Sequence, residues 1–189
     1  FELLFGLRDW DTAARADIER LAVEFPQVPI RIVRVESSTP NGKVGALIDL
    51  ERAAQHDILL VNDSDIRVTP DYLRKVAAPL ANSNTGLVTC LYRALGHNFA
   101  GNFESLGVNT DFMPSTLVAP LVGIDEFALG SALAFRRADL HRIGGFESLA
   151  PYIADDYQLG HKLHSLGLAC YFAEPVVETH LGARDMSDV

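Results

Sequence analysis

Two aspartates separated by a single residue are the first candidates for chemistry in this sequence. Asp63 and Asp65 follow the apolar run 58–61, which is typical of a short strand buried on both faces. In an extended backbone, side chains two residues apart point to the same side, so both carboxylates can bind one divalent cation. Hard oxygen ligands of this kind favour Mg²⁺ or Mn²⁺ over zinc. The alternative interpretation is a polar strand end that binds nothing.

Several other site motifs are absent from the sequence. An EF-hand loop starting at Asp63 would need Gly and Glu at two positions that hold Val68 and Arg74. Gly42-Lys43 lacks the flanking residues of a P-loop, and there is no G-x-G-x-x-G, H-E-x-x-H or G-x-S-x-G pattern. The carboxylate pair must therefore be interpreted together with the elements that position it.

Composition and charge limit the class of protein. The 189 residues are enough for one well-buried domain, and their formal net charge of −9 argues against nucleic acid or an acidic membrane surface as a partner. Cys90 and Cys170 lie in separate apolar segments, which favours buried free thiols in a reducing compartment over a disulfide. No apolar run reaches the ~18 residues of a membrane span, and no signal peptide is visible. Because Phe1 already reads as part of a strand, we expect a piece of a longer protein, truncated at both ends.

Strands and helices alternate along the sequence, which predicts a layered α/β domain. Hydrophobic periodicity predicts strands at 1–7, 30–35, 58–61, 86–93, 129–135 and 168–172. It predicts helices at about 13–25, 43–56, 69–82, 138–143 and 155–166. Thr12 is suited to cap the first of these helices, and Gly167 to end the last.

The segment 94–127 differs from the rest of the sequence. It has little periodicity and many Gly, Pro and Asn residues, so we expect an irregular segment that is functional or mobile. Its apolar anchors are Phe99, Phe103, Phe112, Met113 and Leu117.

Four passages, in this order, resemble the GT-A nucleotide-sugar glycosyltransferases and, within them, the ceramide glucosyltransferase family. They are Asp9-Trp10-Asp11, Gly42-Lys43, Asp63-Ser64-Asp65-Ile66-Arg67-Val68-Thr69-Pro70-Asp71, and the stretch from Gly130 through Gly144-Gly145-Phe146 to Ala154-Asp155-Asp156-Tyr157. The third passage is similar to that family's Asp-Ser-Gly-Ile-Arg-Val stretch, with Asp65 where a Gly can stand. The resemblance covers nearly the whole chain. It implies the GT-A (nucleotide-diphospho-sugar transferase) fold, a mostly parallel mixed sheet flanked by helices, in a single catalytic domain over residues 1–189.

The resemblance also implies which residues bind the nucleotide-sugar donor. Asp11, with Asp9, would hydrogen-bond the uracil or ribose of UDP, and Lys43 would lie near the diphosphate. Helix capping beside Thr12 is the alternative for Asp11, and an exposed lysine at a helix start is the alternative for Lys43.

For the reaction itself, the resemblance implies a metal site and a general base. Asp63 and Asp65 would hold Mn²⁺ or Mg²⁺ against the diphosphate, Asp63 also contacting the donor, and His180 stands where some GT-A enzymes have a third ligand. Asp156 would take the proton from the acceptor hydroxyl, with Asp155 as its neighbour. The alternative for this acidic pair is favourable placement at a helix start, worth about 0.3–1 kcal/mol for each charge.

The function implied is an inverting transfer of glucose or N-acetylglucosamine from a UDP-sugar to a lipid hydroxyl, such as that of ceramide or a hopanoid. The segment 94–127 would face this acceptor, although its apolar residues suit ordinary loop packing equally well. The longer protein is expected at the cytoplasmic face of a membrane, which it would contact through segments outside this soluble piece. Two alternatives are a processive polysaccharide synthase domain of the same fold and a non-catalytic domain that binds nucleotide or a protein partner.

Overall fold

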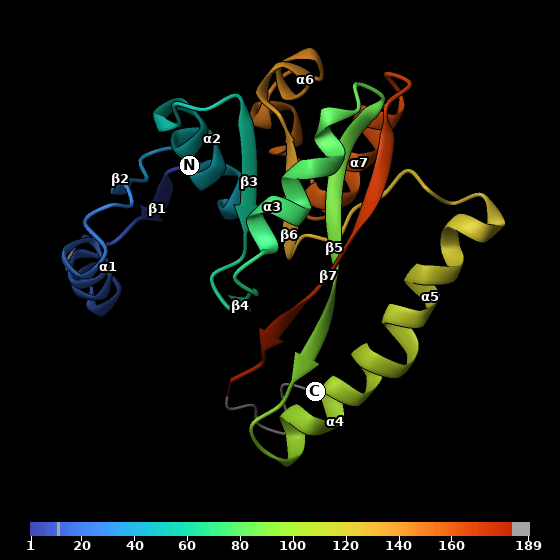
Figure 1. Ribbon diagram of the computed structural model, residues 1–189, viewed down its shortest axis with the longest axis horizontal. Coiled ribbons are helices and arrows are strands. Elements are labelled where there is room, and N and C mark those ends of the chain that lie inside the picture. The colour runs from blue at the N-terminus through green and yellow to red at the C-terminus, as the bar shows by residue number, and fades with distance from the viewer. Residues whose placement is uncertain (11, 183–189) are drawn as a thin grey trace.

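The computed structural model describes residues 1–10 and 12–182, and its first unit is a strand–helix–strand (Figure 1). Strands β1 (Leu3–Leu7) and β2 (Ile30–Arg34) are parallel and form a two-stranded sheet. Helix α1 (Ala13–Glu24) connects them. It begins as predicted, because the Thr12 hydroxyl accepts a hydrogen bond from the backbone N–H of Arg15 at 3.3 Å.

A five-stranded sheet forms the centre of the molecule, with strand order β3-β6-β5-β7-β4. Its strands are β3 (Ile58–Asn62), β4 (Ile66–Arg67), β5 (Thr85–Leu95), β6 (Ala132–Arg136) and β7 (Ala169–His180). The longest ladder joins β5 to β7 in parallel, whereas β6 runs antiparallel to β3 and β5, and β4 antiparallel to β7. The predicted mixed sheet is therefore confirmed, but it is not mostly parallel as expected, because three of its four strand pairings are antiparallel.

Helices cover both faces of this sheet. One face packs against α2 (Gly42–Ala53), α6 (Arg137–Arg142), η4 (Phe146–Leu149) and α7 (Asp155–His164). The other packs against α3 (Tyr72–Ala77) and η1 (Ala78–Ala81). Successive residues of β6 alternate between the two cores, since Leu133 and Phe135 lie in the first and Ala132 and Ala134 in the second. This alternation is what a three-layer α/β arrangement requires.

Strand β3 is less buried than its apolar sequence predicts. Leu59 and Val61 pack against the first core and Leu60 against the second, so both faces are covered as expected. Ile58, however, is 46% exposed, because β3 is an edge strand with no neighbour on one side.

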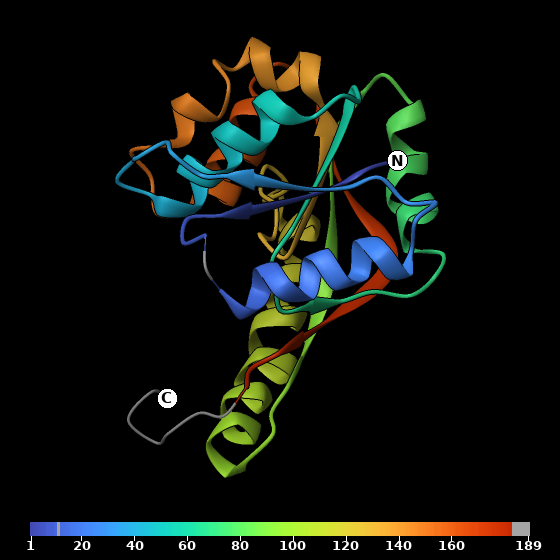
Figure 2. The same cartoon turned by 90° about the vertical axis from the view of Figure 1, so that its left-hand side faces the viewer.

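The prediction of an irregular segment at 94–127 is wrong. Residues 99–122 form almost continuous helix: α4 (Phe99–Gly107), the π-helical turn η2 (Val108–Phe112), α5 (Met113–Val118) and η3 (Ala119–Val122). The π turn interrupts the 3.6-residue period, and Pro114 and Pro120 stand at the starts of α5 and η3, where proline is tolerated. Figures 1 and 2 show this segment extending beside β5, away from β1, β2 and α2. No helix among residues 1–10 and 12–182 is long and apolar enough to cross a bilayer.

Candidate active site

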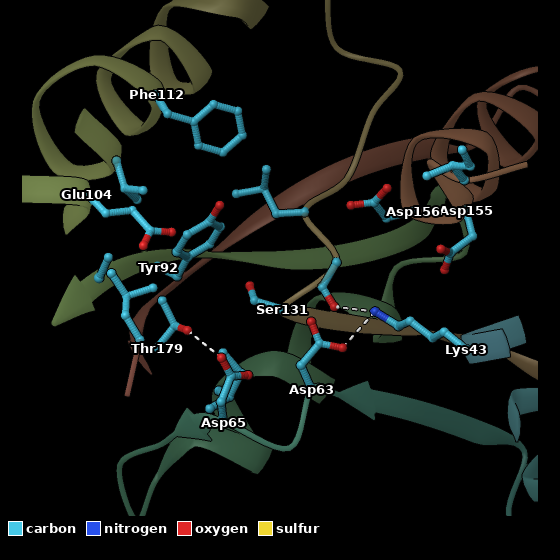
Figure 3. A pocket seen from close by; sticks show the side chains of 17 residues that line it. Lys43, Asp63, Asp65, Tyr92, Glu104, Phe112, Ser131, Asp155, Asp156 and Thr179 are labelled. Carbon is cyan, nitrogen blue, oxygen red and sulfur yellow. Dashed lines mark hydrogen bonds and ion pairs between the residues drawn. The ribbon is translucent and has the colours of Figure 1, made fainter. Parts of the chain in front are cut away.

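A cavity of about 400 Å³ opens where β3, β5, β6 and β7 meet the first turns of α2 and α7 and the side of α4 (Figure 3). Its polar lining comes from seven separate elements or their ends. These residues are Lys43, Asp63, Asp65, Tyr92, Glu104, Ser131, Asp155, Asp156 and Thr179. Lys43 is the only basic side chain among the lining residues, so the cavity is strongly anionic and suits a cation.

Asp63, which follows β3, is paired with Lys43. The Lys43 Nζ lies 2.7 Å from Asp63 Oδ1 and also donates a hydrogen bond to the Gly130 carbonyl at 3.3 Å. Both side chains remain partly exposed to the cavity. The ammonium group therefore sits between the turn after β3 and the turn before β6.

Asp65 is held by strand β7. Its Oδ2 accepts a hydrogen bond from the Thr179 hydroxyl at 2.7 Å, and its carbonyl accepts one from the His180 N–H at 3.3 Å. These bonds continue the antiparallel pairing in which Ile66 stands opposite Thr179. The orientation of this carboxylate thus depends on a residue that the sequence analysis did not identify.

The residue types of Asp63 and Asp65 suit a hard cation, although residues 63–65 form a turn, closed by a 3.3 Å hydrogen bond from the Ile66 N–H to the Asp63 carbonyl, and not the extended backbone expected from the sequence. Among the residues that the structure describes, no group of three or more His, Cys, Asp or Glu side chains is arranged to hold a metal ion. Mg²⁺ is commonly held by one or two carboxylates, with phosphate and water completing the shell, so Asp63 and Asp65 supply a sufficient donor set. His180 does not line the cavity. Its Nδ1 lies 3.2 Å from His97 Nε2 with the two rings stacked, and its role as a ligand stays a prediction.

Asp155 and Asp156 open helix α7, and the structure separates their roles. Asp155 is buried and accepts a hydrogen bond from Asn41 Nδ2 at 3.0 Å. Asn41 also caps α2, because its Oδ1 accepts bonds from the N–H groups of Lys43 and Val44. A single amide therefore ties the starts of α2 and α7 together, and the catalytic role of Asp155 stays a prediction.

Asp156 and Lys43 lie on either side of Gly130. A Cβ atom at residue 130 would be 2.9 Å from Asp156 Oδ2 and 3.4 Å from Lys43 Nζ. Because Gly130 has no side chain, there is space between the Asp156 carboxylate and the Lys43 ammonium group, and both groups face the same part of the cavity. Asp156 Oδ1 accepts a hydrogen bond from the Tyr157 N–H at 2.8 Å, which fixes the carboxylate against the helix start.

Of the two predicted uridine-binding aspartates, the structure describes only Asp9. Asp9 is exposed and does not line the cavity, and Asp11 lies outside the described residues. The neighbouring Arg8 guanidinium donates to the carbonyls of Gly42, at 2.7 Å, and Ser37, at 3.3 Å. The turn after β1 is thereby fixed beside the start of α2, and the donor role of Asp9 stays a prediction.

Three further polar lining residues, Tyr92, Ser131 and Glu104, were not identified by the sequence analysis. Tyr92 has a pKa raised by burial, with the charges of Asp156 and Asp63 adding to the effect. Its ring lies 6.1 Å from that of Phe112, centroid to centroid. The Ser131 hydroxyl is buried and has no hydrogen-bond partner among the described residues, which marks it as a group available to a ligand. Glu104 comes from the segment expected to be irregular, so only its helical periodicity could have revealed it, whereas Phe112 was already named among the apolar anchors of that segment.

Comparisons with known proteins agree on one kind of protein. The family model described as "Glycosyl transferase family 21" matches residues 1–189. The chain is 25% identical over 195 residues to ceramide glucosyltransferase 1 of Caenorhabditis elegans, covering all of this chain and 40% of that protein. It is 30% identical over 155 residues to the beta-monoglucosyldiacylglycerol synthase of Synechocystis sp., covering 79% of this chain and 30% of the relative. The chain therefore spans well under half the length of these curated relatives.

Solved structures show the same fold. The mannosyltransferase PcManGT from Pyrobaculum calidifontis, in complex with GDP-Man and Mn²⁺, superposes with a TM-score of 0.71 at 21% identity, over 99% of this chain and 49% of that one. Glucosyl-3-phosphoglycerate synthase from Mycobacterium tuberculosis, in complex with phosphoglyceric acid, gives a TM-score of 0.59 at 21% identity, over 98% of this chain and 62% of that one. These likenesses confirm the predicted GT-A fold.

Proposed function

The chain belongs to glycosyl transferase family 21, as its resemblance to the ceramide glucosyltransferases predicted, and we propose that it transfers a hexose from a UDP-sugar to a lipid hydroxyl with inversion at the anomeric carbon. The observation that carries the proposal is the shared cavity. Asp63, Asp65 and Lys43 face it from one side, and Asp156 faces it across Gly130. An acidic cation-binding pair opposite a single carboxylate is the arrangement that such a displacement needs.

The donor would occupy the side of the cavity formed by the turn after β3. Asp63 and Asp65 would hold Mn²⁺ or Mg²⁺, which when bound neutralises the diphosphate and stabilises the departing UDP. Lys43 would place its charge beside the same phosphates, and its 2.7 Å pairing with Asp63 keeps it there before the donor arrives. The Mn²⁺ in the PcManGT complex, and in a UDP-bound complex of the M. tuberculosis synthase, supports this assignment.

Asp156 would act as the general base. The acceptor O–H proton passes to its carboxylate while the acceptor oxygen bonds to the anomeric carbon. The bond from that carbon to the diphosphate oxygen breaks on the opposite side, so the configuration inverts. Asp155 keeps the start of α7 in place through Asn41, and Glu104 and Tyr92 are the polar groups nearest the apolar end of the cavity.

A lipid alcohol is the proposed acceptor, for which ceramide and hopanoids are the model chemistries. The relatives in C. elegans and Synechocystis are named as a ceramide glucosyltransferase and as a synthase of monoglucosyldiacylglycerol, and these names support the class. Val108 and Phe112, both from η2, give part of the cavity an apolar lining. The donor sugar is proposed as glucose or N-acetylglucosamine, and residues 1–189 as one catalytic domain of a protein that works at the cytoplasmic face of a membrane.

Thermal unfolding with UDP tests the donor site directly. With Mn²⁺ present, UDP at ~100 times its dissociation constant should raise the free energy of unfolding by about 2.7 kcal/mol. Asp65→Ala should abolish this gain, whereas Asp17→Ala, on the exposed side of α1, should retain it. Hydrolysis or transfer of UDP-glucose that disappears in Asp156→Asn then separates an enzyme from a binding domain. A melting temperature that does not change when UDP and Mn²⁺ are added together would refute the proposal.

A further inference from the structure

The helical segment 99–122 has its polarity reversed relative to an ordinary surface helix. The side packed against the sheet carries mostly small or polar residues: Ala100, Gly101, Ser105, Asn109 and Thr116, with Met113 as the exception. The Asn109 side chain docks on the end of β5 like a strand partner, donating to the Ala94 carbonyl and accepting from the Ala94 N–H, both at 2.9 Å. A surface helix of a soluble protein normally turns its large apolar residues toward this side.

The large apolar residues of this segment face outward instead. We call them the apolar face: Phe99, Phe103, Leu106, Phe112, Leu117, Val118, Leu121, Val122 and Ile124. Their exposed fractions run from 47% for Phe112 to 84% for Leu121. Single exposed apolar residues need no explanation, but nine along one projecting segment mark a contact with another apolar phase. Figure 1 shows the segment standing clear of the N-terminal strands and helices.

This face leads directly into the candidate active site. Phe112 belongs to the apolar face and also lines the cavity, beside Val108 of the same π turn. Ile153, just before α7, is 97% exposed and lines the cavity from the opposite side. Figure 3 shows Phe112 over the cavity, with Glu104 beside it. A molecule with an apolar body on this surface can therefore present a hydroxyl to the carboxylates inside.

The charge of the segment selects the kind of apolar phase. Residues 99–124 contain no Lys, Arg or His, and Glu104 and Asp111 are their only charged residues. The chain as a whole carries a formal net charge of −9. Anionic headgroups would be repelled, whereas the neutral interface of a zwitterionic bilayer imposes no such cost.

We propose that the apolar face lies in the interfacial layer of a lipid bilayer, with the cavity mouth at the membrane surface, so that the acceptor slides into the site without leaving the bilayer. The bilayer contact assigned here goes beyond the proposed reaction, and its role in acceptor delivery rests on that reaction. A lipid that enters from the side exposes only its headgroup hydroxyl to the cavity, while its chains stay among other lipids. The cost of desolvating those chains is thereby avoided.

Flotation with phosphatidylcholine vesicles tests the contact. The unmutated chain should float with the vesicles. Phe103→Glu and Leu121→Glu should each lower its partitioning into vesicles by about tenfold or more, because each removes a large apolar group that the bilayer would bury. Val23→Glu is the matched control, because Val23 is 82% exposed on α1, and it should float like the unmutated chain. Vesicles rich in phosphatidylglycerol should bind the chain less well than phosphatidylcholine alone.

Three results would overturn the proposal. The first is a chain that stays unbound to neutral vesicles, and the second is a Val23→Glu effect as large as that of Leu121→Glu. The third is a dimer, seen by sedimentation, that Leu121→Glu dissociates without any vesicle binding, because a second copy would then cover the face.

With lipid acceptor in vesicles, Leu121→Glu should raise KM while leaving KM for a short-chain, water-soluble acceptor unchanged.

The stabilisation by UDP and Mn²⁺ is measured on the same samples, so that failures can be told apart. A UDP effect without vesicle binding would refute the bilayer contact and leave the donor site standing. Vesicle binding without a UDP effect would support the contact and refute the proposed reaction.

Discussion

Replacing Gly130 by alanine tests the geometry of the candidate site more sharply than removing a carboxylate does. The added Cβ would stand 2.9 Å from Asp156 Oδ2, closer than side-chain carbons approach other atoms, and 3.4 Å from Lys43 Nζ, which is an ordinary contact. The Gly130 backbone does not lie in the left-handed region, so alanine is sterically allowed there. The methyl group therefore displaces the Asp156 carboxylate and little else.

The size of the effect follows from that distance. The carboxylate must retreat by about 0.5 Å to restore ordinary contact with the new methyl group. Because a misplacement of about 1 Å can cost ~100-fold in rate, kcat should fall by roughly 10- to 100-fold, or about 1.4–2.7 kcal/mol in the barrier. The free energy of unfolding should change by less than about 1 kcal/mol, since alanine also restricts the unfolded chain.

Steady-state transfer from UDP-glucose, together with the UDP-dependent melting shift, separates the possibilities. Gly130→Ala should lower kcat and keep the UDP shift, while Gly107→Ala should change neither, because its Cβ meets no atom within 4 Å. An unchanged kcat in Gly130→Ala would show that Asp156 is not the base. Loss of the UDP-dependent melting shift would instead show that residue 130 contacts the donor. It would refute the placement of the donor and the general base on opposite sides of Gly130.

Two further predictions concern stability and thiol reactivity. Burial raises the pKa of the Asp49 carboxyl, but hydrogen bonds from Ser37 and Glu36 outweigh burial and bring the pKa below the usual 3.8. The Asp49 carboxyl therefore binds a proton more readily in the unfolded chain than in the folded one. Its contribution to the free energy of unfolding is complete above the usual pKa of 3.8 and is lost as the pH falls through the lower pKa of the folded chain. Asp49→Asn should cost about 1–2 kcal/mol at pH 7 by chemical denaturation, and the difference should shrink below pH 3.8; a constant difference would contradict the assignment. Burial raises the pKa of Cys90 to about 11 and, with the charges of Asp125 and Glu126 adding, that of Cys170 to about 12, so both free thiols should react slowly with iodoacetamide at pH 8 until the chain is unfolded. Rapid labelling of the native chain would disprove this.

Local patterns predicted most of the scaffold. Thr12 caps α1, the helix predicted at about 43–56 corresponds to α2, and Gly167, with a positive φ of 79°, follows the end of α7. Each of these features depends on neighbours within a turn or two, where residue type and period decide the outcome. The order of the four family-like passages predicted the GT-A fold, because a resemblance carries tertiary information that periodicity lacks.

Contacts between distant segments could not be predicted in this way. Nothing around Thr179 indicates that its hydroxyl holds Asp65, and nothing around Asn41 indicates a bond to Asp155. The helix at 99–122 was missed for a different reason. The π turn shifts its phase between α4 and α5, and proline stands at the starts of α5 and η3, so no single 3.6-residue period runs through the whole segment.

The same two hydrogen bonds have a consequence for biosynthesis. Asn41 and Asp155 are 114 residues apart in sequence, and so are Asp65 and Thr179. A growing chain that has emerged from the ribosome only through α6 already contains Lys43 and Asp65. It still lacks Asp155 and Thr179, whose hydrogen bonds fix the start of α2 and the Asp65 carboxylate. The cavity is therefore completed late, when α7 and then β7 leave the ribosome, and closure over such long separations is entropically slow. Nascent chains stopped before residue 179 should be unable to retain UDP, however well their first strands have folded.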